Sequence, residues 1–261
     1  SPFDPNVAGG AHLHIGTFGK NGSIHKSLDA ALDANKLGGE FKRKDNKFAL
    51  NASEEAALED GRFYINIHTK NHQAGELRGQ VIPKPATIFH AFLSGSQEAQ
   101  PVQSGGMGAG MVAVYKDSLN VTGAFKNLDS TIATSIAGGA HLHNAMAGQN
   151  GDVKIPLNIT PNSMMTGGTF QMDDNRFAVS QAQKMMLMNR AMYFNVHSKK
   201  YKSGELRGQV IPHSTMAFYA NLSGGYEVPA IKSKAYGSVI AEVRNGKLML
   251  SGSFQGLSSE M

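Results

Sequence analysis

Short stretches in which apolar and polar residues alternate recur along the chain, separated by Gly and Asn turns. Residues 38–41 and 46–50 follow this two-residue period, and residues 63–68 form a run rich in aromatic and β-branched side chains. Alternation is typical of antiparallel strands with one buried face, and a β-branched run is typical of a more fully buried strand. The pattern predicts an all-β fold built from antiparallel β-sandwich or barrel domains.

Two segments interrupt the strands with helix-forming residues. Residues 51–61 have acidic residues in the first turn and a closing glycine. Residues 180–188 begin with Ser180 and Gln183 at the spacing of a capping box, in which two side chains satisfy the first backbone N–H groups of a helix. We therefore expect one short helix in each domain.

The same residue pattern occurs twice in the chain. Ala11-His12-Leu13-His14 returns as Ala140-His141-Leu142-His143, so that His141 lies 129 positions after His12. Other segments matched at this displacement are residues 66–68 with 195–197 and residues 75–83 with 204–212. Self-similarity at a fixed displacement indicates a tandem duplication.

Only one of the two copies is continuous. A complete unit occupies residues 86–213, whereas the other is divided between residues 214–261, its amino-terminal third, and residues 1–84, its carboxy-terminal two-thirds. Joining residue 261 directly to residue 1 restores the missing loop with three extra residues. A partial sandwich leaves apolar faces and sheet edges uncovered, so the divided unit has to be completed.

Three arrangements would complete the divided unit. The chain could close on itself as a circular permutant, a neighbouring copy could donate the missing strands, or residues 1–261 could be one period of a longer polypeptide. The last two give open head-to-tail arrays. We expect an array, whose partners are other copies of this chain, and the opening Ser1-Pro2-Phe3 without Met is what a processed or internal fragment would show.

Composition narrows the chemistry that the chain can perform. The 261 residues contain no cysteine, which excludes disulfides, thiolate metal sites and cysteine nucleophiles. The net charge of +5 is scattered, with basic groups at residues 42–44 and 199–202, and small clusters of this kind are typical of solvated surfaces rather than nucleic-acid interfaces. No apolar run of about 18 residues is present, so we expect no membrane span.

The repeated segments resemble the CHRD family, a domain first described in chordin and widespread in secreted bacterial and archaeal proteins. The segments that carry the resemblance are Leu93-Ser94-Gly95 with Glu98, and residues 138–143, 193–198 and 204–209, with counterparts at residues 222–224 with Glu227, 9–14, 64–69 and 75–80. The resemblance implies an antiparallel β-sandwich or barrel in an exported, extracellular protein, and it implies no particular activity.

The repeated histidines are candidate metal ligands. In a strand, residues two apart point to the same side, so both imidazoles of each His-Leu-His segment share a face. If the strand of the third histidine lies alongside, three imidazoles meet, a donor set suited to zinc or copper. The candidate ligands are His12, His14 and His68 in one unit and His141, His143 and His197 in the other. Alternatively, these histidines hydrogen bond to the backbone or to Glu76 and Glu205, which fixes the sheet register.

A second repeated group consists of Glu76 and Arg78 and their counterparts Glu205 and Arg207. The two residues of each pair share one strand face and lie too close along the strand to oppose each other well. We expect each to reach a cross-strand or loop partner in a structural polar network. No nucleophile accompanies these residues, so we predict no enzymatic activity.

These observations favour a non-enzymatic extracellular structural protein, in which two CHRD-like units per period join head to tail into a surface fibre or adhesin. A second hypothesis is a secreted module that holds zinc or copper at the histidine strands, resembling superoxide dismutase in architecture. A third is a module that binds a protein ligand, as in chordin. No cofactor is required by the first hypothesis.

Overall fold

The structure of the protein is a computed structural model that describes residues 2–7, 9–82, 87–212, 216–244 and 246–258. Its contacts divide the chain into two compact units, Ser1–Pro85 and Ala86–Met261. The predicted boundaries at residues 84–86 and 213–214 fall almost entirely outside the described residues and stay predictions. The described strands pair only in antiparallel fashion, which confirms the all-β prediction.

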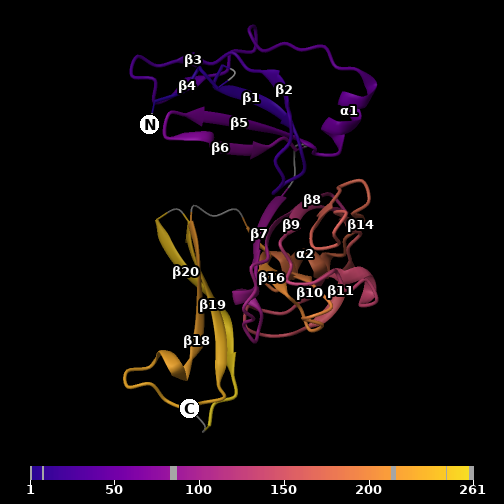
Figure 1. Cartoon of the computed structure of the whole chain (residues 1–261), viewed down its shortest axis with the longest axis vertical. Helices are drawn as coiled ribbons and strands as arrows, with labels where there is room; N and C mark the ends of the chain where they lie inside the picture. The colour runs from indigo at the N-terminus through magenta and orange to yellow at the C-terminus, as the bar shows by residue number, and fades with distance from the viewer. Residues whose placement is uncertain (1, 8, 83–86, 213–215, 245, 259–261) are drawn as a thin grey trace. The chain divides into compact units, whose positions relative to one another are not determined.

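The first unit contains a four-stranded sheet in the order β2-β1-β5-β6 and a separate pair, β3 with β4 (Figure 1). Its elements are β1 (Ala11–Ile15), β2 (Ile24–Ser27), β3 (Ala31–Leu32), β4 (Gly39–Glu40), α1 (Ala52–Glu59), β5 (Phe63–Thr69) and β6 (His72–Gln80). Since β6 is the last strand in this order, one of its edges pairs with no described strand.

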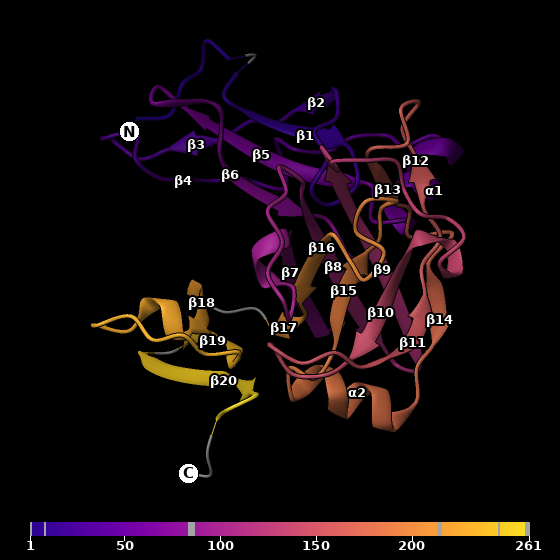
Figure 2. The same cartoon turned by 60° about the horizontal axis from the view of Figure 1, so that its bottom comes forward.

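The second unit contains a complete domain formed by an eleven-stranded sheet, which curls around a common interior (Figure 2). Its strand order is β11-β10-β15-β16-β7-β8-β9-β13-β12, with β14 paired to β9 and β17 to β7. These elements are β7 (Thr87–Ser94), β8 (Met107–Tyr115), β9 (Ser118–Lys126), β10 (Ala140–Asn144), β11 (Asp152–Pro156), β12 (Thr160–Pro161), β13 (Gly168–Phe170), β14 (Arg176–Ala178), α2 (Gln181–Met188), β15 (Tyr193–Val196), β16 (Leu206–Gln209) and β17 (Ile211–Pro212).

The same unit carries a three-stranded sheet near the end of the chain, in the order β18-β19-β20. Its strands are β18 (Met216–Ser223), β19 (Tyr236–Arg244) and β20 (Lys247–Gln255). Single-turn 3-10 helices lie at η1 (Gly95–Gln97), η2 (Ala137–Gly139) and η3 (Gly224–Tyr226). By the displacement of 129 residues, β18 to β20 are the counterparts of β7 to β9.

Both α-helices begin with a capping box, which was predicted for Ser180 and Gln183 and is a new finding at Asn51. The Asn51 side chain accepts the N–H of Glu54, whose carboxylate accepts the N–H of Asn51 at 2.7 Å. Ser180 and Gln183 form the same reciprocal pair at the start of α2. One short helix per copy is therefore confirmed, and its start is fixed by side chains that satisfy the otherwise unpaired N–H groups of the first turn.

The core of the complete domain lies between the two sides of its curled sheet. Strands β7, β8 and β9 contribute Phe89, Val112 and Leu119, each with 1% of its surface exposed or less. Leu142 of β10 and Phe194 of β15 pack in the same cluster and are fully buried. The first three strands of the domain thus cover the apolar face of the remaining ones, and burial of this area is the main source of stability.

The structure differs from the sequence prediction at residues 46–50, which form no strand. Their counterparts in the complete domain form β14, which pairs with β9 through Arg176 opposite Asn120. The counterpart of β9 is β20, and β20 pairs only with β19 among the described strands. The alternating pattern is therefore present at residues 46–50, but a strand needs a partner and the first unit contains none for this segment.

Equivalent apolar positions are buried in the complete domain and exposed in the divided copy. Leu119 and Phe125 of β9 are almost completely buried, whereas Leu248 and Phe254 of β20 are 64% and 51% exposed. On the other fragment, Leu77 of β6 is 61% exposed although its counterpart in β16 is fully buried. Both fragments of the divided copy therefore present the residues that form the core of the complete one.

The opposite face of the three-stranded sheet contacts the complete domain. Ile240 of β19 is buried with Ala147 and Ile211, and the Arg190 guanidinium forms an ion pair with Glu242 at 2.6 Å. Residues on alternate sides of a strand face opposite ways. These contacts consequently hold β18 to β20 against the complete domain through one face. The other face stays exposed, and it carries the core-type residues, which are the apolar residues whose counterparts are buried in the complete domain.

No helix in the described part of the chain is both long and apolar enough to cross a membrane.

Gly208 of β16 and Gly79 of β6 occupy equivalent positions in the two copies, so substitutions there compare the buried strand with the exposed one. A Cβ at Gly208 would lie 2.7 Å from the Phe92 carbonyl oxygen and 3.0 Å from Leu93 Cδ1, whereas a Cβ at Gly79 would have no atom within 4 Å. We expect Gly208→Ala to lower the free energy of unfolding by roughly 1–3 kcal/mol, because overpacking forces the backbone to shift. Gly79→Ala should change it by less than about 0.5 kcal/mol in the dilute chain. Urea denaturation of both variants measures this difference. Equal losses in the free energy of unfolding would contradict the exposed position of Gly79 on β6.

Candidate metal centres

The two His-Leu-His segments lie on β1 and β10, each of which is flanked by a strand on both sides, β1 by β2 and β5 and β10 by β11 and β15. β1 pairs with β5 so that His12 is opposite Asn66, and β10 pairs with β15 so that His141 is opposite Asn195. The leucine between the two histidines points the other way, and Leu142 is part of the hydrophobic core. The imidazoles therefore lie on the face of the sheet that is opposite the apolar core.

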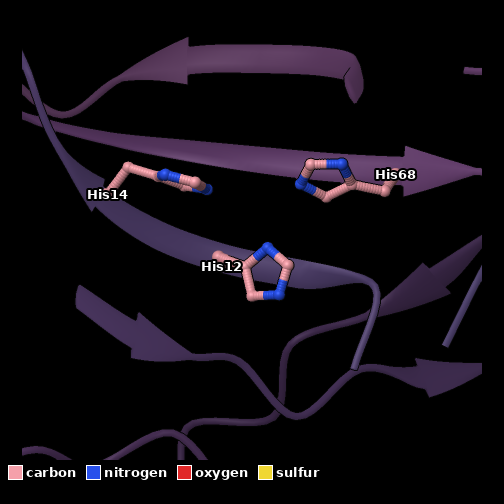
Figure 3. Close-up of side chains that lie close together, drawn as sticks. All are labelled: His12, His14 and His68. Carbon is pink, nitrogen blue, oxygen red and sulfur yellow. The ribbon is translucent and has the colours of Figure 1, made fainter. Parts of the chain in front are cut away.

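The third histidine of each group is brought to the same face by the neighbouring strand. His68 lies on β5, and its backbone N–H donates to the Gly10 carbonyl at 2.8 Å. In the other copy the backbone N–H of His197 donates to the Gly139 carbonyl at 2.9 Å. Figure 3 shows the rings of His12, His14 and His68 turned toward one another from β1 and β5. One ligand nitrogen from each ring lies within 4.8 Å of the other two.

The second triad repeats this geometry closely. The ring centroids of His141 and His197 are 5.0 Å apart and those of His141 and His143 are 5.4 Å apart, compared with 4.9 Å and 5.5 Å for the corresponding pairs of the first triad. The structure thus brings together all six predicted ligands in two groups of three. Two copies that differ at many surrounding positions hold the same arrangement.

Backbone carbonyls hold these rings in a defined orientation. His14 Nδ1 and His143 Nδ1 lie 3.1 Å and 2.9 Å from the carbonyl oxygens of Gly22 and Gly151. His197 Nδ1 contacts the Lys202 carbonyl in the same way, at 2.9 Å. A carbonyl can only accept, so each of these nitrogens carries the proton, and the other ring nitrogen keeps its lone pair.

The lone pairs of the second triad are buried and unused. His141 donates through Nε2 to the Ala137 carbonyl at 2.8 Å, which leaves its Nδ1 as the acceptor. That Nδ1, His143 Nε2 and His197 Nε2 have no hydrogen-bond partner among the described residues, and neither do His14 Nε2 and His68 Nε2 in the first unit. The backbone hydrogen bonds predicted as the alternative to metal binding are therefore present, and they leave the opposite nitrogens unpaired.

Burial disfavours the charged form of several of these imidazoles. Burial lowers the pKa of His197 to about 4, and it also lowers the pKa values of His14 and His143 below the ordinary range of an imidazole. His12 and His141 have 1% or less of their surface exposed. A metal ion binds the neutral form of an imidazole, and at His14, His143 and His197 burial favours that form by lowering the pKa.

A tyrosine and an arginine support each triad, and their joint role was not anticipated from the sequence. Tyr64 stacks on His14 with ring centroids 4.8 Å apart, and the Arg78 guanidinium lies 3.4 Å from the Tyr64 centroid. Tyr193 and Arg207 repeat this stack on the second copy. The available signal was the recurrence of the tyrosine directly across the strand pair from the last histidine of each segment.

The arginines and glutamates of the predicted polar network bind loops. Arg207, only 1% exposed, donates to the carbonyls of Gln149 at 2.7 Å and Met146 at 2.9 Å, and Arg78 donates to the Thr17 and Lys20 carbonyls. These hydrogen bonds hold the loop that covers each triad. Charge-assisted bonds of this kind are about twice as strong as neutral ones.

The two glutamates are engaged outside the triads. Glu205 accepts from the Ser104 hydroxyl at 2.5 Å and from the Asp129 N–H at 2.7 Å. Glu76 accepts from the Thr69 hydroxyl. Neither carboxylate belongs to the three-residue groups, so the donor set of each candidate centre is nitrogen only.

Glu98 is a further buried group on this face of the complete domain. It lies just after η1 and accepts from the Asn195 amide at 3.0 Å. Burial raises the pKa of its carboxyl to about 7, although the positive charge of Arg207 and the bond from Asn195 oppose this shift. Its counterpart Glu227 is exposed.

The comparisons with known proteins identify one family. A sequence model of the CHRD domain matches residues 4–81 and residues 89–210, two stretches in tandem. CHRD domains are typically found in secreted proteins and are extracellular-type modules. No curated protein and no solved structure matches the chain.

The raised pKa of Glu98 predicts a pH-dependent stability of the complete domain. The folded carboxyl keeps its proton up to about pH 7, whereas an unfolded one loses it near pH 4.5. The folded state therefore binds more protons between these values, and the free energy of unfolding should fall as pH rises through this window, by roughly 3 kcal/mol in total.

Urea denaturation of the wild-type chain and of Glu98→Gln between pH 4.5 and 7.5 measures this effect. The variant keeps a neutral hydrogen-bonding group, so the fall should be largely absent. Glu59→Gln, at an exposed position of α1, is the control and should behave as the wild type. Parallel curves for wild type and Glu98→Gln would show that the carboxyl does not carry the effect.

Proposed function

The chain belongs to the CHRD domain family, and on that premise we propose that it is a non-enzymatic extracellular structural protein whose copies join head to tail into a fibre or surface adhesin. The observation that carries this proposal is the contrast between the two copies. Apolar residues that form the core of the complete domain are exposed at the equivalent positions of both fragments of the divided one.

The complete domain supplies the template for the missing contact. There, β16 pairs with β7 so that Arg207 is opposite Ser94. The same displacement places Arg78 of β6 opposite Ser223 of β18, and Leu77 and Leu222 would enter the core beside them. Addition of a strand to an open sheet edge supplies main-chain hydrogen bonds, and the alternate side chains supply specificity.

The apolar area involved is large enough to drive association. The exposed core-type side chains are Leu77 on one fragment and Phe218, Leu222, Leu248, Leu250 and Phe254 on the other. Burial of each contributes roughly 1.5–3 kcal/mol, so the gross gain is on the order of 10 kcal/mol. This is comparable with the cost of association, and the new strand pairing adds to it.

The contact is heterologous, because the surface on one fragment differs from the surface that receives it. Such contacts extend into open arrays unless a rotation closes them into a ring. The ion pair between Arg190 and Glu242 supports this arrangement, since it holds β18 to β20 against the complete domain while their core-type face is presented outward. Each copy would then offer three strands to the next.

A cysteine pair tests whether the strands are exchanged between chains. The chain contains no cysteine, so Arg78→Cys together with Ser223→Cys provides the only thiols. Residues directly opposite on antiparallel strands are close enough for a disulfide. After mild oxidation we expect a ladder of covalent multimers on a non-reducing gel, and filaments by electron microscopy.

The matched control is Arg78→Ser with Ser223→Cys, which loses the same guanidinium and cannot form the ladder. A disulfide within one chain would overturn the array and indicate self-closure. Failure to form any disulfide, with a monodisperse monomer by sedimentation, would overturn completion of the divided domain in this register.

A further inference from the structure

Each histidine triad has the features of a built ligand site rather than of a hydrogen-bonded cluster. Three imidazole nitrogens point at one another, and in the second triad none of them has a hydrogen-bond donor among the described residues. A buried acceptor without a partner costs roughly 1–3 kcal/mol. That cost occurs several times in one triad and again in the other, and one cation that accepts these lone pairs would remove it at every nitrogen that it binds.

A cation that coordinates nitrogen suits this arrangement, because three ring nitrogens converge and no ring proton of the second triad points at the centre. Every proton on the carbonyl-bound nitrogens is already directed away from the centre, toward the carbonyls of Gly151, Lys202 and Ala137 in the second triad. Histidines that bind metals usually donate their other N–H to a carbonyl or carboxylate in this way. The carbonyls therefore preset both the tautomer and the direction of each ligand.

We propose that each triad, His12, His14 and His68 in the first unit and His141, His143 and His197 in the second, binds one copper ion through three imidazole nitrogens. Ligands about 2 Å from one ion lie roughly 3.3 Å apart, so binding would draw the three nitrogens inward from their present separation.

The donor set selects copper over the other common ions. It contains three imidazole nitrogens, and neither a carboxylate nor a thiolate belongs to the groups. Calcium and magnesium prefer oxygen ligands, whereas zinc can bind three imidazoles at a site with an open position and is therefore the competing ion. Nitrogen sites bind Cu²⁺ more tightly than the other divalent ions of the first row, and three imidazoles leave a position open for a further ligand.

This inference goes beyond the proposed structural role and does not depend on it. The triads lie on the sheet face opposite the core, so completion of the divided domain would cover different residues. His12 and His68 are 5% exposed or less even though the first unit has no counterpart of β7 to β9. Metal content can therefore be measured on the unassembled chain.

The experiment titrates the full-length, chelator-treated chain with Cu²⁺, with Zn²⁺ and with both at equal concentration. We expect two copper ions per chain by elemental analysis, and a Cu²⁺ electron paramagnetic resonance spectrum with splitting from three nitrogens. His143→Gln should reduce the stoichiometry from two to one, and His68→Gln should do the same. His72→Ala, at an exposed histidine outside both triads, is the control and should still bind two.

Copper below 0.2 equivalents per chain, or two ions retained in the His143→Gln variant, would overturn the proposal. Zinc that stays bound against equimolar copper would overturn the choice of metal. If either variant does not fold, as judged by circular dichroism, the nitrogen splitting in the wild-type spectrum decides, because a surface-bound ion would not show three equivalent imidazole donors.

Discussion

The pairing of β16 with β7 is the contact on which the rest of this structure depends. It joins the strands that carry the triad to the three strands that cover the apolar face, and so it closes the core of the complete domain. Where the equivalent contact is missing, β6 keeps an open edge, and residues 46–50 form no strand. The exposed leucines and the absent strand at residues 46–50 thus correspond to positions that are buried in the complete domain or paired there with β9.

The sheet separates two kinds of chemistry on its two faces. Successive side chains of a strand point to opposite faces of the sheet. Leu142 and Phe194 therefore lie in the core, whereas His141 and Asn195 lie on the other face. The polar face is held by hydrogen bonds from Arg207 to loop carbonyls, whereas the apolar face is held by area burial alone. Because the two faces are stabilised through different residues, the polar face can keep its hydrogen bonds while the apolar face stays exposed. The first unit is in that state.

The sequence was sufficient for the fold class, the duplication, the helix starts and the identity of the six histidines. Each rests on a local signal, such as a two-residue period, a capping box or a repeated word. The prediction that three histidines meet depended on a condition, because the sequence does not say which strand lies beside β1. The Tyr64 and Arg78 stack and the absence of a strand at residues 46–50 were missed, since both depend on partners distant in sequence.

Independence of the two faces also bears on the stability of the first unit. An open apolar face invites aggregation, so a chain whose unpaired fragments had to find partners would benefit from units that are already rigid. The triads supply rigidity where the first unit lacks a full core: the Gly10 and Gly22 carbonyls, the Tyr64 stack and the loop bound by Arg78 converge on one small polar region. An ion held there would join β1 to β5 without using the edge of β6. A metal centre would therefore stabilise the four-stranded sheet of the first unit while leaving the edge of β6 unchanged.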